Sequence, residues 1–296
     1  MTMTRVLAGC LLLLLTCGSG ICQKTATRAN TANEEVATVK DVTFHSASLQ
    51  RDMRYRVLFP REYNRGRFPV LYLLHGLYGD YQNWDMRTKL ENYARNVQLL
   101  IVMPDARDSW YTNSASVPGD KFEDYIAKDL ISEVDEKYRT IRSRQDRAIA
   151  GLSMGGYGAV KLALKYPDLF AFAGSLSGAL NAPQDLDTLR PEFRSQLLQV
   201  FGREGSPARA DNDVFLLLDT SSKTPYPYLY LGCGTADPFL ETNRSLALQL
   251  SLRKMTYEYH ETPGGHTWEY WDTALKPMLE AMERSLVEMT SKAEKR

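Results

Sequence analysis

The stretch that decides the fold is Ala148-Ile149-Ala150-Gly151-Leu152-Ser153-Met154-Gly155, near the middle of a chain of 296 residues. An apolar tripeptide leads into the pattern G-x-S-x-G, and a helical pattern without a breaker continues to Pro167. A strand, a tight turn and a helix in this order are typical of a nucleophile elbow, which holds a strained serine with its hydroxyl exposed. An ordinary glycine-rich turn is the alternative. We expect the elbow, with Ser153 as nucleophile and with glycines at 151 and 155 because side chains there would collide with neighbouring backbone.

Segments of alternating and of continuous apolar character surround this stretch. Residues 39–44 and 54–59 alternate, as half-exposed antiparallel strands do, whereas 70–74 and 99–103 are apolar runs that suit central parallel strands. Further strands are predicted over 148–150, 228–231 and 255–261, and helices over 122–138, 155–166, 240–252 and 267–289. Asp120 is a candidate N-cap for the first helix, with Glu123 completing a capping box. This order predicts an α/β fold with a mostly parallel central sheet, helices on both faces and an antiparallel N-terminal start.

The composition limits the classes of protein to which this chain can belong. Its 36 basic and 36 acidic residues give a formal net charge of zero, which argues against nucleic-acid binding. Hydrophobic residues make up 44%, enough for a packed core. We predict a single domain over 36–290. The segment 178–224 fits the strand–helix order poorly, and we interpret it as a cap or pocket-wall insertion.

The N-terminus has the pattern of a secretory leader. A short segment ending in Arg5 precedes an apolar run, and small residues follow at 18–20. The apolar run is shorter than the ~20 residues that span a bilayer. We therefore predict a signal peptide over 1–22 and a secreted or periplasmic protein without a membrane span. Leu7-Ala8-Gly9-Cys10 resembles a lipoprotein cleavage box, but the apolar run follows Cys10, so lipid anchoring is disfavoured.

A serine nucleophile needs a base, and the chain has four histidines. His45 and His260 lie within strand patterns, and His75 ends an early apolar run, where packing within a loop explains it best. His266 follows Pro263-Gly264-Gly265 in a predicted loop between the last strand and the last helix. Because sheets of this type carry functional groups in loops at the carboxyl ends of their strands, we expect His266 to be the base.

The base needs an acid that orients its ring, and in this fold the acid lies between the serine and the histidine along the chain. Asp237 follows the 228–231 strand through a Gly-Cys-Gly-Thr-Ala turn, which would place it at a carboxyl end of the sheet. Asp219 is the rival, but it ends a helix-like run. We predict Asp237 as the acid, with a solvated Asp-Pro turn as the alternative.

The tetrahedral intermediate of acyl transfer needs hydrogen-bond donors for its oxyanion. One donor is expected to be the backbone amide of Met154, directly after the nucleophile, and the other an amide in the loop after an early strand. His75-Gly76-Leu77-Tyr78-Gly79 ends the 70–74 run, so we choose the backbone amide of Leu77. An ordinary turn is again the alternative.

Two aromatic residues, Trp110 and Tyr111, follow the 99–103 strand and are candidates for the wall of a substrate pocket. Packing of both rings against the core is an equally weighted alternative. The sequence contains no metal-ligand cluster, phosphate-binding glycine loop or cofactor motif, so neither a metal nor a cofactor is predicted.

Four motifs in a fixed order together resemble the putative-esterase family of α/β-hydrolases: LLHGLYG at 73–79, GLSMGGYG at 151–158, GCGTAD at 232–237 and GGH at 264–266. That family includes esterase D (S-formylglutathione hydrolase), tributyrin esterases, feruloyl esterases and mycolyltransferases. The resemblance covers about 36–289 and implies an α/β-hydrolase fold. It also implies the family's nucleophile, acid and base at Ser153, Asp237 and His266, and its oxyanion amides at Leu77 and Met154.

Taken together, these observations predict an exported serine carboxylic ester hydrolase that forms an acyl-enzyme. Short-chain, aryl or carbohydrate-linked esters are the expected partners, because no long amphipathic segment for lipid surfaces is found and the neutral charge gives no attraction to anionic membranes. An acyltransferase would use the same residues, and the sequence leaves that alternative open. A non-catalytic surface protein on the same scaffold is disfavoured by the intact Ser-Asp-His order.

Overall fold

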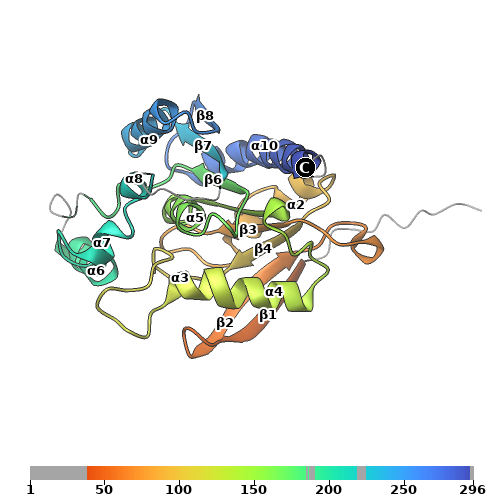
Figure 1. The fold of residues 1–296 in the computed structure, drawn as a ribbon, viewed down its shortest axis with the longest axis horizontal. Helices are drawn as coiled ribbons and strands as arrows, with labels where there is room; N and C mark the ends of the chain where they lie inside the picture. The colour runs from red at the N-terminus through yellow and green to blue at the C-terminus, as the bar shows by residue number, and fades with distance from the viewer. Residues whose placement is uncertain (1–38, 185, 187–190, 219–224, 294–296) are drawn as a thin grey trace, which may run out of the picture. The chain divides into compact units, whose positions relative to one another are not determined.

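The computed structural model describes residues 39–184, 186, 191–218 and 225–293. The predicted signal peptide over 1–22 and the rival acid Asp219 lie outside the described residues. Figure 1 shows one central sheet with helices on either side. None of the described helices is both long and apolar enough to cross a membrane.

Within the described residues eight strands form the sheet, in the order β1-β2-β4-β3-β5-β6-β7-β8. They are β1 (Val39–Ser46), β2 (Arg51–Leu58), β3 (Val70–Leu74), β4 (Leu100–Pro104), β5 (Arg147–Leu152), β6 (Phe172–Leu176), β7 (Tyr228–Gly234) and β8 (Tyr257–Thr262). β2 is antiparallel to both β1 and β4, whereas all pairs from β4–β3 to β7–β8 are parallel. The predicted mostly parallel sheet with an antiparallel start is confirmed.

Helices cover both faces of the sheet (Figure 1). One face carries α3 (Phe122–Asp124), the π-helical segment η2 (Tyr125–Leu130), α4 (Ile131–Lys137), α5 (Met154–Lys165) and α9 (Leu240–Leu252). The other face carries α1 (Asn83–Arg87), α2 (Leu90–Ala94) and α10 (Trp268–Ala293). The segment 178–224 contributes α6 (Pro191–Phe201), α7 (Pro207–Ala210) and α8 (Val214–Leu217), and the loops hold the 3₁₀ turns η1 (Tyr63–Arg65) and η3 (Arg144–Asp146).

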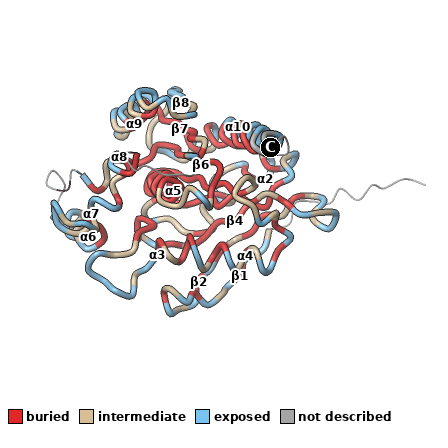
Figure 2. The backbone as a smooth tube through the Cα atoms, in the orientation of Figure 1, coloured by how far each residue is buried: buried red, intermediate tan, exposed pale blue. Residues whose placement is uncertain are grey.

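The two faces form separate apolar cores, and Figure 2 shows the most buried backbone in the central strands and α5. Every residue of β3, β4 and β5 is buried. Burial from both sides is the reason why β3 and β4 are continuous apolar runs rather than alternating ones.

Strand β6 is the one central strand that the sequence patterns do not predict. Three small residues in succession, Ala173, Gly174 and Ser175, occupy its middle, although all five residues are buried. A Cβ on Gly174 would lie 2.6 Å from Sδ of Met278 in α10. The small residues thus let α10 pack closely on the sheet, and this requirement hides the strand from an apolar pattern.

The helical stretch after residue 120 begins differently from the prediction. Asp120 does not cap it, because its carboxylate accepts a hydrogen bond from Nη2 of Arg51 at 2.6 Å. The amides of Glu123 and Asp124 instead donate to Oδ1 of Asn113, each at 3.1 Å. The predicted capping box is therefore wrong: the cap comes from a residue ten positions upstream, outside the local spacing that a capping box requires.

Candidate active site

Ser153 stands at the turn between β5 and α5, with φ 52° and ψ −118°. A positive φ is uncommon for a residue other than glycine and marks the strained turn that the motif predicts. The flanking glycines are required sterically. A Cβ on Gly151 would lie 2.5 Å from the carbonyl carbon of Gly155, and one on Gly155 would lie 2.5 Å from the carbonyl oxygens of Leu74 and His75.

The structure brings the predicted acid and base to this serine. Nε2 of His266 lies 2.9 Å from Oγ of Ser153, and Nδ1 lies 3.0 Å from Oδ2 of Asp237. The other carboxylate oxygen, Oδ1, accepts the backbone N–H of Phe239 at 2.8 Å. When the Nδ1 proton is directed to the carboxylate, Nε2 is free to accept the hydroxyl proton of the serine.

The side chain of Asp237 is fully buried, yet its environment favours the ionised form. Burial alone raises the pKa of Asp237, but hydrogen bonds from His266 and from the backbone of Phe239 outweigh it and hold the pKa below its ordinary value. A carboxylate that stays negative at this position stabilises positive charge on the imidazole.

The acid and the base are carried by the loops that follow β7 and β8, and these loops contact each other. A Cβ on Gly234 would lie 2.4 Å from the carbonyl oxygen of Gly264, which also accepts the amide of Ala236 at 2.9 Å. Gly264 has φ 147°, a conformation that favours glycine. Close approach of the two backbones therefore brings Asp237 and His266 together across 29 positions of sequence.

The two predicted oxyanion amides lie in segments next to Ser153. Met154 is the first residue of α5, so its N–H belongs to the unpaired donors at the positive end of the helix. Leu77 lines the same cavity as Ser153, and among the described residues its amide has no hydrogen-bond partner. The next amide, that of Tyr78, donates to Oδ1 of Asp108 at 2.7 Å and so fixes the loop.

The other histidines have partners away from this serine. The buried Nε2 of His75 accepts the amide of Ala106 at 3.0 Å, and its Nδ1 donates to the carbonyl of the next residue at 2.8 Å. Burial lowers the pKa of His75, which keeps the ring neutral, so its predicted packing role is confirmed. His45 is exposed on β1, and His260 stacks on Tyr230 with ring centroids 5.1 Å apart.

A cavity of about 670 Å³ opens over Ser153 and His266. Its wall includes Trp110, as predicted. The described part of the segment 178–224 also contributes to it. The further lining residues are Gly76, Leu77, Tyr78, Gly79, Asn83, Arg87, Leu152, Ala179, Asn181, Ala182, Phe193, Leu197, Phe239, Trp268 and Trp271.

Tyr111 does not line this cavity, contrary to the prediction. Its side chain is fully buried, its hydroxyl donates to the carbonyl of His75 at 2.8 Å, and its ring packs on Gly158 of α5. Trp110 and Tyr111 have φ values of 57° and 53°, so the chain turns sharply between neighbouring side chains. Adjacency in sequence therefore could not show which ring faces the cavity.

Further aromatic residues that no sequence motif points to line the cavity, among them Phe193, Phe239, Trp268 and Trp271. Trp271 meets the imidazole of His266 edge-on at 4.8 Å between ring centroids, and Phe239 does so at 5.2 Å. Trp268 and Trp271 lie three positions apart at the start of α10, directly after His266. Residues three positions apart lie on the same face of a helix, so this spacing predicts two aromatic side chains together beside the base.

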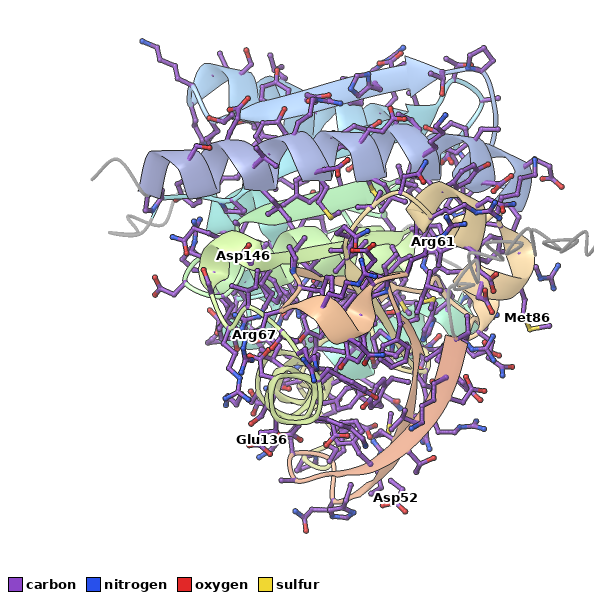
Figure 3. All side chains as sticks on the ribbon, turned by 90° about the vertical axis from the view of Figure 1, so that its right-hand side faces the viewer. Asp52, Arg61, Arg67, Met86, Glu136 and Asp146 are labelled. Carbon is purple, nitrogen blue, oxygen red and sulfur yellow. The ribbon has the colours of Figure 1, made fainter. Side chains whose placement is uncertain are left out.

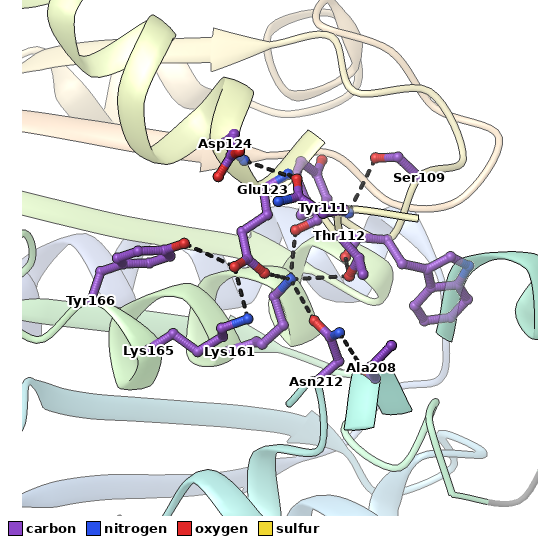
Figure 4. A network of polar contacts seen from close by, with 12 residues as sticks. Ser109, Tyr111, Thr112, Glu123, Asp124, Lys161, Lys165, Tyr166, Ala208 and Asn212 are labelled. Carbon is purple, nitrogen blue, oxygen red and sulfur yellow. Dashed lines mark hydrogen bonds and ion pairs between the residues drawn. The ribbon is translucent and has the colours of Figure 1, made fainter. Parts of the chain in front are cut away.

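A buried ion pair lies behind Tyr111 (Figure 4). Nζ of Lys161, in α5, lies 2.8 Å from Oε2 of Glu123 and donates to the carbonyl of Tyr111 at 2.6 Å. It also reaches Oδ1 of Asn212, in the turn before α8, at 3.2 Å. The ammonium of this α5 residue thus contacts α3, the loop that carries Trp110 and the segment 178–224. In the part of the chain that the structure describes, no group of three or more His, Cys, Asp or Glu side chains could hold a metal ion.

The sheet order, the strained serine and the aligned histidine and carboxylate define a serine hydrolase of the α/β-hydrolase fold. The chain belongs to the family described as "Putative esterase", whose model matches residues 46–282, and it is an enzyme of the serine esterase class.

Known proteins resemble most of the chain. The acetyl esterase of Caldicellulosiruptor saccharolyticus is 25% identical over 83% of this chain and 98% of its own length. Esterase Rv1288 of Mycobacterium tuberculosis is 30% identical over 76% of this chain, but over only 55% of its own length. The structure of FphF, a fluorophosphonate-binding serine hydrolase of Staphylococcus aureus, has a TM-score of 0.76 and 29% identity, covering 83% of this chain and 98% of FphF.

Proposed function

We propose that this chain is an exported carboxylic ester hydrolase in which Ser153 is the nucleophile, His266 the general base and Asp237 the acid that orients it. The proposal rests on two successive hydrogen bonds at the edge of a cavity. Asp237 Oδ2 lies 3.0 Å from His266 Nδ1, and His266 Nε2 lies 2.9 Å from Ser153 Oγ. The leader pattern at 1–22 supports export.

The geometry suits a two-step acyl transfer. Oγ of Ser153 attacks the ester carbonyl while Nε2 of His266 takes its proton, and Asp237 stabilises the resulting imidazolium. The amides of Leu77 and Met154 donate to the oxyanion of the tetrahedral intermediate. Nε2 then protonates the leaving oxygen, and a water molecule activated by the same nitrogen hydrolyses the acyl-enzyme.

The catalytic assignment is tested by Ser153→Ala, which should lower kcat by about 10⁴ to 10⁶ without changing the fold. A fluorophosphonate probe should label the wild-type protein at Ser153 and leave the variant unlabelled. Retention of more than about a tenth of the wild-type kcat would contradict the assignment, since removal of a triad serine costs far more than this. An alcohol added to the assay as acceptor distinguishes hydrolysis from transfer, because transfer would yield a new ester.

For the substrate, we propose short acyl chains, acetyl to butyryl, on aryl or carbohydrate leaving groups. The cavity of about 670 Å³ has aromatic walls at Trp110 and Trp268, which suit small acyl groups and flat or ring-shaped leaving groups. The resemblance to an acetyl esterase points to the same acyl length. Values of kcat/KM for nitrophenyl esters with two to sixteen acyl carbons test this proposal, and a maximum at the long chains would contradict it.

Export has a separate test. N-terminal sequencing of the protein recovered from the medium or the periplasm should show a mature chain that begins between about residues 18 and 26. An intact Met1 on the active protein would contradict a cleaved leader. A diacylglycerol on Cys10, Cys17 or Cys22 would instead show the lipid anchoring that the sequence disfavours.

A further inference from the structure

The two walls of the cavity differ in chemistry. One wall is apolar, with Trp110, Phe193 and Leu197, and the rings of Trp110 and Phe193 have centroids 6.4 Å apart. The other wall contains two polar residues of α1, Asn83 and Arg87, which line the same cavity. A substrate that fills the cavity therefore meets an apolar surface at one side and a cation at the other.

A chain of aromatic contacts connects α1 to the proposed base. Trp84 of α1 meets Trp268 edge-on at 5.8 Å between ring centroids, and Trp268 meets Trp271 at 5.2 Å. Trp271 in turn meets the ring of His266 at 4.8 Å. The polar residues of α1 are thus on the side of the cavity where the imidazole stands, and we call Asn83, Arg87, Trp268 and Trp271 the histidine-side wall.

The reaction assigns a role to each side, on the basis of the proposed function. Nε2 of His266 must reach the leaving oxygen or sulfur to protonate it, so the leaving group departs on the side of the imidazole. The acyl group then points away from His266, toward Trp110 and the apolar wall. The histidine-side wall consequently faces the alcohol or thiol part of the substrate.

Arg87 has no ion-pair partner among the described residues. The residue is exposed, and no carboxylate in the described part of the chain lies within ion-pair distance of its guanidinium. Two acidic residues with known partners bind other cations. Asp85, the nearest in sequence, accepts a hydrogen bond from Nη1 of Arg56 at 2.7 Å, and Asp272 of α10 accepts the amide of Lys89 at 2.7 Å and lies 3.7 Å from its ammonium. Met86, which is 71% exposed, points away from the molecule beside it (Figure 3).

We propose that Arg87 is a specificity-determining residue that binds a carboxylate on the leaving group, so that the preferred substrates are esters or thioesters of an acidic alcohol or thiol. A guanidinium can donate two parallel hydrogen bonds to the two oxygens of a carboxylate, which gives orientation as well as attraction. Asn83 and Trp268 complete this subsite with a neutral polar group and a flat apolar surface. The rest of the cavity continues to hold the short acyl group.

Two chromogenic esters with the same acyl group test the subsite: 4-nitrophenyl acetate and 3-carboxy-4-nitrophenyl acetate. Each kcat/KM is divided by the rate constant of alkaline hydrolysis of the same ester, which removes the difference in intrinsic reactivity. The wild-type enzyme should prefer the carboxylated ester, and Arg87→Gln should reduce that preference by about twofold to fivefold, the size of one favourable exposed ion pair. Arg87→Lys should restore part of it, and Arg87→Glu should reverse it.

Lys89→Gln is the matched control. It removes a positive charge two positions away that does not line the cavity, so the preference should remain as in the wild type. Added sodium chloride should weaken the wild-type preference because it screens exposed charges, and it should leave Arg87→Gln unaffected.

The outcomes separate this inference from the proposed function. An equal preference in the wild type and Arg87→Gln, or an equal loss in Lys89→Gln, would overturn the subsite and leave the esterase assignment standing. Hydrolysis of both esters by Ser153→Ala at the wild-type rate would overturn the esterase assignment and the subsite with it.

Discussion

Replacing Lys161 by methionine should lower the free energy of unfolding by about 3–5 kcal/mol, the cost of breaking one side of a buried ion pair. The ammonium is fully buried and lies within reach of four acceptors. These are Glu123 Oε2 at 2.8 Å, the carbonyl of Tyr111 at 2.6 Å, Thr112 Oγ1 at 3.0 Å and Asn212 Oδ1 at 3.2 Å. Methionine fills most of the space but donates no hydrogen bond.

The contacts that remain decide where in this range the loss falls. The neutral acceptors on Tyr111, Thr112 and Asn212 would lose a charged donor, and a buried unsatisfied acceptor costs about 1–3 kcal/mol. Glu123 keeps Nζ of Lys165 at 2.7 Å and the hydroxyl of Tyr166 at 2.8 Å, so its charge is not left unpaired. Because these partners are retained, the loss should fall at the lower end of the ~3–5 kcal/mol range.

Equilibrium unfolding in urea measures the change, followed by tryptophan fluorescence and circular dichroism, with the slope against urea concentration fitted separately for each variant. The matched control is Lys128→Met, because Lys128 is 62% exposed and pairs with Asp124 four residues earlier at 2.9 Å; its loss should stay below about 0.5 kcal/mol. The double variant with Glu123→Gln should lose less than the sum of the two single variants, since both disrupt one network. A loss below about 1 kcal/mol for Lys161→Met, with an unchanged slope, would refute the reasoning.

Four further results are expected. Burial raises the pKa of Glu123, but two neighbouring lysine charges outweigh it and lower the pKa to about 2. The resulting stabilisation of the folded state, about 3 kcal/mol, is present above the ordinary pKa of 4.5 and is lost as the pH falls toward 2. Glu123→Gln should remove this part of the acid dependence of stability. An unchanged midpoint of acid unfolding in that variant would count against the ion pair with Lys161. Asp237→Asn should preserve the melting temperature while kcat falls by about 10⁴, and a decrease of less than about tenfold would exclude the orienting role. Gly155→Ala should destabilise by about 2 kcal/mol because its Cβ would lie 2.5 Å from two carbonyl oxygens, whereas Gly66→Ala, with no atom within 4 Å, should be nearly neutral; equal stability of the two variants would contradict the steric argument. Trp110→Ala should shift the preferred acyl chain to greater length, and an unaltered chain-length profile would place the acyl group elsewhere.

The local features of this protein could be predicted from its sequence because they depend on neighbours in the chain. The strained turn at Ser153 follows from glycines at 151 and 155, whose absent side chains are a local steric requirement. Strands β3 and β4 can be predicted from continuous apolar runs because both faces of each strand are buried. The order of serine, acid and base along the chain selected Asp237 and His266, which the structure places within hydrogen-bond distance of each other.

Features that depend on distant partners escaped prediction. Strand β6 is built from small residues that make room for α10, and the helix after residue 120 is capped by Asn113. Tyr111 turns into the core while Trp110 faces the cavity, because two successive positive φ values redirect the chain. In each case the deciding neighbour belongs to another element or depends on a backbone conformation that residue type does not specify.

The sequence by itself determined the alternation of strands and helices, the elbow and the residue types of the proposed catalytic line, since periodicity and glycine sterics act over a few residues. Only the tertiary structure decided that Ser153 and His266, 113 positions apart, share a hydrogen bond, and that Lys161 and Glu123, 38 positions apart, form a buried pair. It also decided that Arg87 lines the cavity without a carboxylate partner among the described residues. These contacts depend on how the helices and loops pack around the sheet, and the sum of many weak long-range interactions sets that packing.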